Sequence, residues 1–276
     1  VMPIRKLNRL IALKTLKNFD INKNLAFNKL FDLNNKKNKL NISDLGFLIG
    51  PILNAGGRLG KSEKATELLS SNNLEVINLK SKELIELNNK RKKIETIILE
   101  EIDFLKIENE NKKIIFYYNS NINEGLIGII AARLKDYFNK PSIVMTNSND
   151  LIKGSARSIY DYNIGRAIKC SLDNDLILAG GGHNMAAGFT LKKDNLKNFE
   201  NFISNDFSKS GSLTDNIFLY DAEVSSLAFN KEFYDDIKIL EPFGTGNPTP
   251  TFLLRNLKVI KSKILNNKHI SLILKS

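Results

Sequence analysis

The hydrophobic pattern changes its period near residue 112, and this change constrains the fold more than any other feature of the sequence. Residues 113–118 and 142–146 are short, continuous apolar runs of strand length, and residues 124–138 between them repeat their apolar positions at helical spacing. Two buried strands joined by a helix form a β-α-β unit, which implies a parallel pair with a right-handed crossover. The sequence therefore predicts an α/β domain in this part of the chain.

The same alternation continues to residue 208. We expect a strand over residues 151–158, a helix over 164–172, a strand over 185–191 and a helix over about 195–207. Three consecutive glycines, Gly180 to Gly182, precede the last strand and are expected to form a loop. Glycine loops at strand ends are where such domains bind ligands.

Residues 179–188 read Ala-Gly-Gly-Gly-His-Asn-Met-Ala-Ala-Gly and supply the first candidate binding residues. Glycines such as Gly181 and Gly182 let backbone N–H groups approach a ligand closely, and His183 adds one or two N–H donors. Together they suit an oxyanion such as a phosphodiester. A short glycine motif is a weak signal, so a flexible loop that carries a histidine is the alternative.

A second candidate segment, Lys-Gly-Ser-Ala-Arg-Ser over residues 153–158, supplies a hydroxyl and a guanidinium. If its strand lies beside the strand that follows His183, then Ser155, Arg157 and His183 converge on one place. The alternative is an ordinary surface ion pair between Arg157 and Asp161.

A third candidate segment is the glycine-rich stretch of residues 51–60, whose polar side chains are Asn54 and Arg58. We expect a short helix before it to stop at Gly50-Pro51. An arginine is a forked donor that suits phosphate, and the glycines would let a substrate strand pass closely. The alternative is a surface arginine in a turn.

One long helix is expected from about residue 74 to 107, because apolar residues recur there at steps of three and four. At about 1.5 Å per residue it would be about 45 Å long and would act as a spacer between domains, with a cleft alongside. A dimeric coiled coil is the alternative, although the apolar register is irregular.

The last part of the chain, residues 210–276, is predicted to be rich in strands. We expect strands over residues 217–224 and 251–260, a helix over 229–239 and a hairpin turn at 266–268. This pattern is typical of part of a small β-barrel such as an OB-fold.

Composition and charge favour a nucleic-acid partner. The net charge is +11, and residues 1–60 hold 11 Lys and Arg against three Asp and Glu. The alternative is a general richness in Lys, Asn and Ile, as an AT-rich coding sequence produces. One cysteine, Cys170, is compatible with a reducing cytoplasm, and no signal peptide or long apolar run is present. We therefore expect a soluble cytoplasmic protein without a membrane partner.

With these segments in hand, the sequence resembles the RecJ family of single-stranded-DNA-specific exonucleases, within the DHH phosphoesterase superfamily. Five motifs stand in the family's order: residues 50–59 (Gly-Pro-Ile-Leu-Asn-Ala-Gly-Gly-Arg-Leu), 124–134 (Glu-Gly-Leu-Ile-Gly-Ile-Ile-Ala-Ala-Arg-Leu), 154–158 (Gly-Ser-Ala-Arg-Ser), 181–188 (Gly-Gly-His-Asn-Met-Ala-Ala-Gly) and 240–248 (Leu-Glu-Pro-Phe-Gly-Thr-Gly-Asn-Pro). One departure is Ile122-Asn123, where the family usually has Trp-His before Glu-Gly.

The resemblance implies an α/β fold in four parts: the C-terminal part of a DHH domain over residues 1–72, a connecting helix over 73–112, a DHHA1 domain over 113–208 and a partial OB-fold over 209–276. It also implies a 5′-3′ exonuclease of DNA repair and recombination, whose substrate would be gripped by Arg58, Ser155, Arg157 and His183.

The family uses Mn²⁺ or Mg²⁺, which activate water and stabilise the departing oxygen. The resemblance places the metal ligands in the first part of the DHH domain, including an Asp-His-His motif, and none of those motifs occurs in this sequence. Residues 1–3 resemble the tail of the family's last metal-binding motif. We therefore expect a fragment that binds no metal itself and has no catalytic residue.

Two other functions fit parts of this pattern. The chain could belong to a DHH-type phosphodiesterase for short oligonucleotides or cyclic dinucleotides, although the start of an OB-fold argues against this. It could also be a non-catalytic nucleic-acid-binding module, because DHHA1-like domains occur in alanyl-tRNA synthetases. The expected partner is single-stranded DNA, and the expected state is a monomer whose repair-protein partners are unknown.

Overall fold

The computed structural model describes residues 3–37, 39–211, 219–266 and 269–275. The chain divides into two compact units. One comprises residues 22–37 and 47–216, and the other residues 1–21, 38–46 and 217–276. In the part of the chain that is described, no helix is long and apolar enough to cross a membrane.

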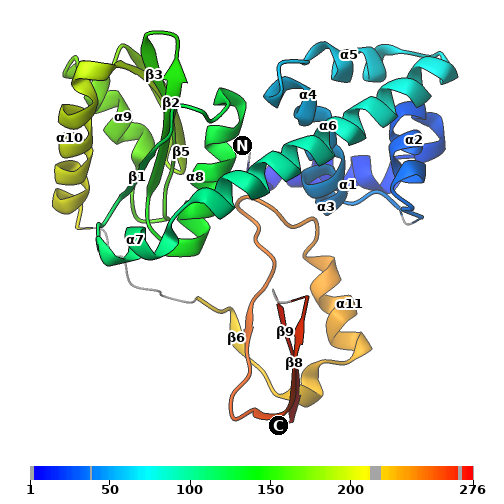
Figure 1. Ribbon diagram of the computed structural model, residues 1–276. Coiled ribbons are helices and arrows are strands. Elements are labelled where there is room, and N and C mark those ends of the chain that lie inside the picture. Colours follow the sequence, from blue (N-terminus) through cyan, green and yellow to red (C-terminus); the bar gives the residue numbers. More distant parts are fainter. Residues whose placement is uncertain (1–2, 38, 212–218, 267–268, 276) are drawn as a thin grey trace. The chain divides into compact units, whose positions relative to one another are not determined.

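The α/β domain is built on a five-stranded mixed sheet in the order β1-β2-β3-β5-β4 (Figure 1). The strands are β1 (Ile115–Tyr118), β2 (Ser142–Ser148), β3 (Leu151–Arg157), β4 (Ala179–His183) and β5 (Ala186–Lys192). β1 and β2 are parallel and are joined by α8 (Glu124–Phe138), so the predicted β-α-β unit is confirmed. β3, β5 and β4 add antiparallel strands beyond β2.

Alternating side chains along the strands form two separate apolar layers. Helices α9 (Ile164–Asp173) and α10 (Leu196–Lys209) cover one face of the sheet, where Ile143, Ala156 and Phe189 are buried. Helix α8 covers the other face over β2 and β3, where Val144 lies in its apolar cluster. Each fully buried large apolar side chain contributes about 1.5–3 kcal/mol.

The connecting helix is shorter than the sequence pattern predicted. Helix α6 (Leu74–Glu101) has 28 residues, a length of about 42 Å, and is followed by a separate short helix, α7 (Phe104–Asn109). Between them Ile102 is extended, and the Asp103 carboxylate caps α7 by accepting a hydrogen bond from the Lys106 N–H. The expectation of one helix to residue 107 is therefore wrong, because Asp103 caps the start of a second helix.

Helix α6 is the central helix of the helical part of this unit. It packs against α2 (Leu25–Leu33), α4 (Gly50–Arg58) and α5 (Glu63–Ser70), and it also contacts α8 of the α/β domain. The same helix therefore holds both α4 and α8.

Both glycine-rich segments have regular structure, which corrects two sequence expectations. Residues 50–58 are helical in α4, which continues from α3 (Ile42–Asp44) and the π-helical turn η2 (Leu45–Ile49). Pro51 does not stop this helix: it lies just after the π-helical turn, at the start of α4, and α4 packs on α6. Gly180 to Gly182 do not form a loop, because their backbone pairs with β5 as strand β4.

The remaining short elements complete the chain order. They are α1 (Lys6–Asn18), η1 (Ile21–Lys23), η3 (Lys193–Asn195), β6 (Ala222–Glu223), η4 (Ser226–Ala228), α11 (Lys231–Ile239), β7 (Phe252–Leu253), β8 (Lys258–Leu265) and β9 (His269–Lys275).

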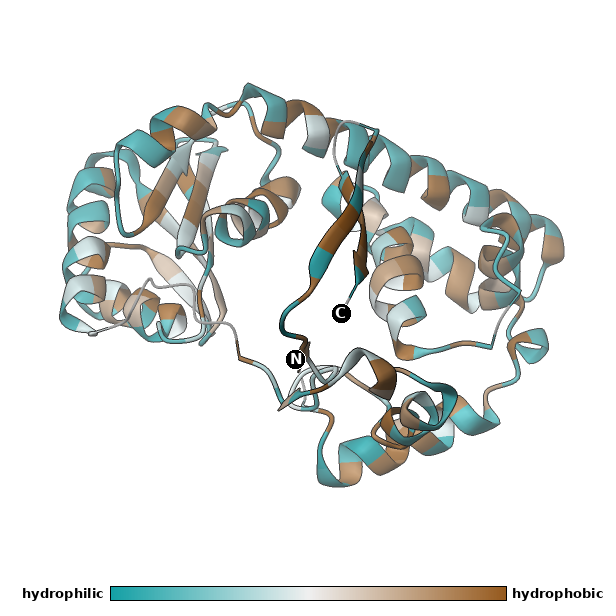
Figure 2. Cartoon of the chain, turned by 90° about the horizontal axis from the view of Figure 1, so that it is seen from below, coloured by the Kyte–Doolittle hydropathy of each residue, from teal (hydrophilic) through white to brown (hydrophobic). Residues whose placement is uncertain are grey.

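The last sixty residues contain less sheet than expected. The strand expected over residues 217–224 is seen as β6 alone, since 217 and 218 lie outside the described residues, and the strand expected over 251–260 is divided between β7 and β8. The predicted hairpin forms, with β8 and β9 antiparallel, while residues 267–268 of its turn lie outside the described part. Apolar residues run along this hairpin in Figure 2, and Ile264 and Ile270 are exposed.

Candidate nucleic-acid interface

Strands β5 and β4 extend the sheet beyond helix α8, which packs on β2 and β3. The strand register aligns three rows of residues on the α8 side of the sheet: Lys153–Thr190–Ala179, Ser155–Gly188–Gly181 and Arg157–Ala186–His183. All nine residues are exposed or partly exposed. We call this set the open sheet face. β3 does lie beside β5, so Ser155, Arg157 and His183 share this face, together with Gly181. The Cα atoms of Arg157 and His183 are about 10 Å apart, because β5 lies between them.

Arg157 lies against helix α8. Its Nη1 donates hydrogen bonds to the Ser155 Oγ at 3.1 Å and to the Ala156 carbonyl at 2.8 Å. A Cβ added to Gly128 of α8 would lie 2.9 Å from the Arg157 Nη2, so the glycine leaves room for the guanidinium in the position seen here. The guanidinium is thus fixed against α8 at the side of the open sheet face.

Arg58 reaches the same helix from α4. Its Nη1 donates a hydrogen bond to the Gly125 carbonyl at 3.0 Å, and a Cβ on Gly125 would lie 2.2 Å from the Arg58 carbonyl oxygen. Two glycines one turn apart, Gly125 and Gly128, therefore let α4 and Arg157 approach α8. Asn54 is exposed one turn before Arg58 in α4.

The two guanidinium groups affect each other electrostatically. Burial lowers the pKa of Arg157 below its usual value, and the positive charge of Arg58 lowers it further. Burial and the nearby Arg91 lower the pKa of Arg58, while Glu95 opposes that change. Among the residues that the structure describes, no carboxylate forms an ion pair with Arg58 or Arg157. The expected alternative of an Arg157–Asp161 pair is therefore not found, and an anion between the arginines would relieve their repulsion.

His183 ends strand β4 and is held by its backbone. Its Nδ1 accepts a hydrogen bond from the Met185 N–H at 3.3 Å, which leaves the proton of the neutral ring on Nε2. Gly165, in the first turn of α9, lies so close that a Cβ there would be within 2.9 Å of the His183 backbone. The ring therefore offers an Nε2–H donor on the open sheet face.

The glycines of β4 differ in whether packing leaves room for a side chain. A Cβ on Gly180 or Gly182 would collide with packed atoms, the nearest being the Ile177 Cδ1 at 2.7 Å and the Ala186 carbonyl oxygen at 2.3 Å. Gly182 is thus packed on the opposite face from Ser155. A Cβ on Gly181 would meet nothing within 4 Å, and one on Gly188 would come no closer than 3.8 Å to any atom. Packing therefore does not require glycine at Gly181 and Gly188, where the open sheet face is bare.

An open hollow of about 380 Å³ borders this face and the N-terminal end of α8. Its lining includes Glu124, Ile127, Lys153, Gly188 and Thr190. Lys153 forms an ion pair with Glu124 and, as the largest cause, lowers the pKa of that carboxyl group. Lys153 and Gly188 were not among the predicted binding residues. Counting every second residue along β3 and β5 would have placed both on the same face as Ser155.

The described residues do not fit a divalent metal centre. In the part of the chain that the structure describes, no group of three or more His, Cys, Asp or Glu side chains could hold a metal ion. Beside the open sheet face, Arg157 and the nearby Arg58 are positively charged, while Lys153 is paired with Glu124. The charge of the two arginines suits an anion.

Residues 111–209, which contain the mixed sheet with α8, α9 and α10, match the DHHA1 domain family. Residues 220–276 match the RecJ OB domain. The chain belongs to the RecJ family, and its α/β fold class is as expected.

Curated relatives agree with this assignment. The chain is 30% identical over 289 residues to the single-stranded-DNA-specific exonuclease RecJ of Haemophilus influenzae, covering 99% of this chain and 50% of that protein. It is 28% identical to the Bacillus subtilis protein of the same name, covering 100% of this chain and 36% of that one. The chain thus spans half or less of the length of these relatives.

Solved structures share the fold. Thermus thermophilus RecJ in complex with Mg²⁺ matches with a TM-score of 0.81 at 24% identity, over 99% of this chain and 43% of that one. The complex of the same protein with Mn²⁺ gives a TM-score of 0.83, over 99% of this chain and 41% of the other.

Proposed function

We propose that this chain holds single-stranded DNA within a 5′-3′ exonuclease of the RecJ type, with Asn54, Arg58, Ser155, Arg157, Gly181, Gly182 and His183 as its phosphate-binding residues. The observation that carries the proposal is the arginine pair. Arg58 and Arg157 are partly buried, repel each other and form no ion pair with a described carboxylate. A phosphate oxyanion supplies the missing negative charge and accepts forked N–H donors.

The shape of the open sheet face supports a strand as the ligand. Gly181 and Gly188 leave the middle row without side chains beyond Ser155, so a sugar-phosphate backbone can lie close to the sheet. Ser155 offers a donor within that row, and Arg157 and His183 line one side of it with donors. Gly182 has no side chain and contributes only backbone groups.

The proposal assigns binding to this chain and no hydrolytic step. The relatives' printed names describe single-stranded-DNA-specific exonucleases, and Mg²⁺ and Mn²⁺ are present in the Thermus thermophilus structures. In such an enzyme the metals activate water and stabilise the leaving oxygen. We propose that this chain binds neither ion and works as a monomer in the cytoplasm.

Salt-dependent binding to an end-labelled oligo-dT tests the proposal by fluorescence anisotropy. Affinity should fall as salt rises, with a slope of about −0.7 for each phosphate contact. Arg157→Ala should weaken binding and make the slope shallower by about 0.7–1, because one contact is lost. His183→Ala should also weaken binding.

The matched control is Lys169→Ala, which removes one exposed positive charge from α9 on the opposite face of the sheet. It should leave both affinity and slope nearly unchanged. Equal losses of affinity for oligo-dT in Arg157→Ala and Lys169→Ala would contradict phosphate binding by Arg157. Tighter binding of a cyclic dinucleotide than of oligo-dT would favour a phosphodiesterase for small substrates instead.

A further inference from the structure

Tyr160 stands out as an exposed aromatic side chain in an otherwise anchored turn. It is 91% exposed, whereas Ile159 before it is 8% exposed and Tyr162 after it is 1% exposed. Both neighbours belong to the apolar cluster under α9 and α10. A single exposed aromatic residue is ordinary on a protein surface, so the position and the anchoring of Tyr160 must carry the argument.

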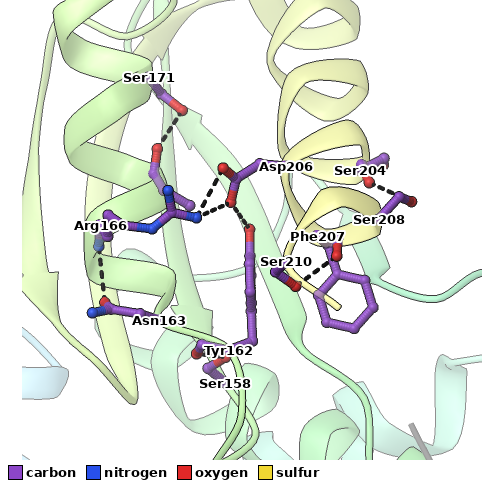
Figure 3. Close-up of polar contacts among 11 residues, drawn as sticks. Ser158, Tyr162, Asn163, Arg166, Ser171, Ser204, Asp206, Phe207, Ser208 and Ser210 are labelled. Carbon is purple, nitrogen blue, oxygen red and sulfur yellow. Dashed lines mark hydrogen bonds and ion pairs between the residues drawn. The ribbon is translucent and has the colours of Figure 1, made fainter. Parts of the chain in front are cut away.

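The turn is anchored through Tyr162 and Ser158 (Figure 3). The Tyr162 hydroxyl donates to the Asp206 carboxylate at 3.0 Å, and the Arg166 Nη2 donates to both oxygens of that carboxylate at 2.9 Å. The Ser158 hydroxyl donates to the Tyr162 carbonyl at 2.7 Å, which closes the turn around Tyr160. Burial and the Asp206 charge raise the pKa of Tyr162, so its hydroxyl stays a donor at neutral pH.

The same turn is bonded to the hairpin that carries His183. The Ser158 N–H donates to the Met185 carbonyl at 2.9 Å, and the Ile164 N–H donates to the Asn184 carbonyl at 3.2 Å. Tyr160 follows Arg157 by three residues, so their Cα atoms are at most about 11 Å apart. Because the Ser158 bond continues the strand pairing past Arg157, Tyr160 follows the end of the row that contains Arg157 and His183.

We propose that Tyr160 stacks on a base of the DNA strand whose phosphates are held on the open sheet face. This inference rests on the proposed function. Proteins that bind single strands without sequence preference combine a cationic track with aromatic rings, since every base has a face on which a ring can stack. A turn fixed at both ends presents the ring with little loss of backbone freedom on binding.

The test compares two strands of equal charge, an ordinary oligo-dT and an oligonucleotide of the same length whose residues are all abasic. Tyr160→Ala should weaken binding to oligo-dT about fivefold or more and leave binding to the abasic strand unchanged. Tyr160→Phe should restore the binding of oligo-dT, because the ring is kept. The salt slope should be the same in all three proteins, because no phosphate contact changes.

The control is Tyr137→Ala. Tyr137 is 66% exposed at the opposite end of α8, about 20 Å along the helix from its first turn. Removing the Tyr137 ring should change neither the affinity for oligo-dT nor the affinity for the abasic strand. Wild-type affinity of Tyr160→Ala for oligo-dT, or an equal loss on both strands, would overturn the stacking role. An Arg157→Ala variant with undiminished binding to both strands would instead overturn the phosphate grip.

Discussion

Gly181 and Gly182 are adjacent in β4, but the structure constrains them differently. Gly182 is required by packing, because a Cβ would lie 2.3 Å from the Ala186 carbonyl oxygen and 2.5 Å from the Ala187 Cα. Gly181 faces open space. Within a strand, glycine is less stable than alanine by about 0.5–1 kcal/mol. A glycine that lowers strand stability although a side chain would fit is expected where a ligand comes close to the backbone.

Gly181→Ala should therefore keep or slightly raise the thermal unfolding midpoint, while Gly182→Ala should lower it by several degrees, since backbone atoms cannot move aside cheaply. Thermal unfolding followed by circular dichroism measures both. Gly181→Val should weaken binding of oligo-dT although the protein stays folded. Unchanged binding by Gly181→Val would show that the strand does not pass over this row.

Helix α6 carries the polar network that joins the helical part to the α/β domain. The Glu95 carboxylate is 8% exposed and accepts hydrogen bonds from the Arg91 Nη1 at 2.8 Å and from the Arg133 Nε of α8 at 2.7 Å. The Arg91 Nε donates to the Asn88 Oδ1 at 3.2 Å. Glu95 is thus the carboxylate that compensates Arg91, whose charge also reaches Arg58.

Glu95→Gln should destabilise the chain by about 3 kcal/mol, because it leaves the charge of the buried Arg91 uncompensated. Arg133→Ala should cost no more than about 1 kcal/mol, since the Arg133 side chain is 57% exposed and solvent screens its charge. Urea unfolding of the two variants measures the difference. Similar midpoints for Glu95→Gln and the wild type would mean that this network does not join α6 to α8 energetically.

The chain is strongly basic, and its described residues contain no candidate metal site. Net charge is +11, and no described cluster of three acidic, histidine or cysteine side chains could hold a cation. A ligand that binds only the folded state raises the unfolding midpoint, by an amount that grows with the ligand concentration relative to Kd. Added ions therefore give a direct test of what this chain binds.

Millimolar Mn²⁺ or Mg²⁺ should leave the thermal midpoint of the chain unchanged, and no nuclease activity should appear with either ion. Oligo-dT should raise the midpoint at low salt and not at high salt. Differential scanning fluorimetry with and without a chelator makes the comparison. A saturable rise with Mn²⁺ would contradict the proposed absence of a metal site.

The sequence by itself determined the elements whose signals are local. Continuous apolar runs and a helical period gave β1, α8 and β2 with their parallel pairing, and α8 was predicted with its observed bounds, residues 124–138. Chemistry could also be assigned from residue type, since Arg58, Ser155 and Arg157 are phosphate donors in any fold. The end of α6 after Glu101 could also have been predicted from the sequence, because Asp103 is a typical N-cap residue for a new helix.

Only the tertiary structure decided which residues share a face. Strand β4 exists because its glycines pair with β5, and α4 continues past Gly50-Pro51 because it packs on α6. Arg58 meets Arg157 only because Gly125 and Gly128 let both approach α8. Strand register and helix packing join residues far apart in the chain, and no periodicity within a segment encodes them.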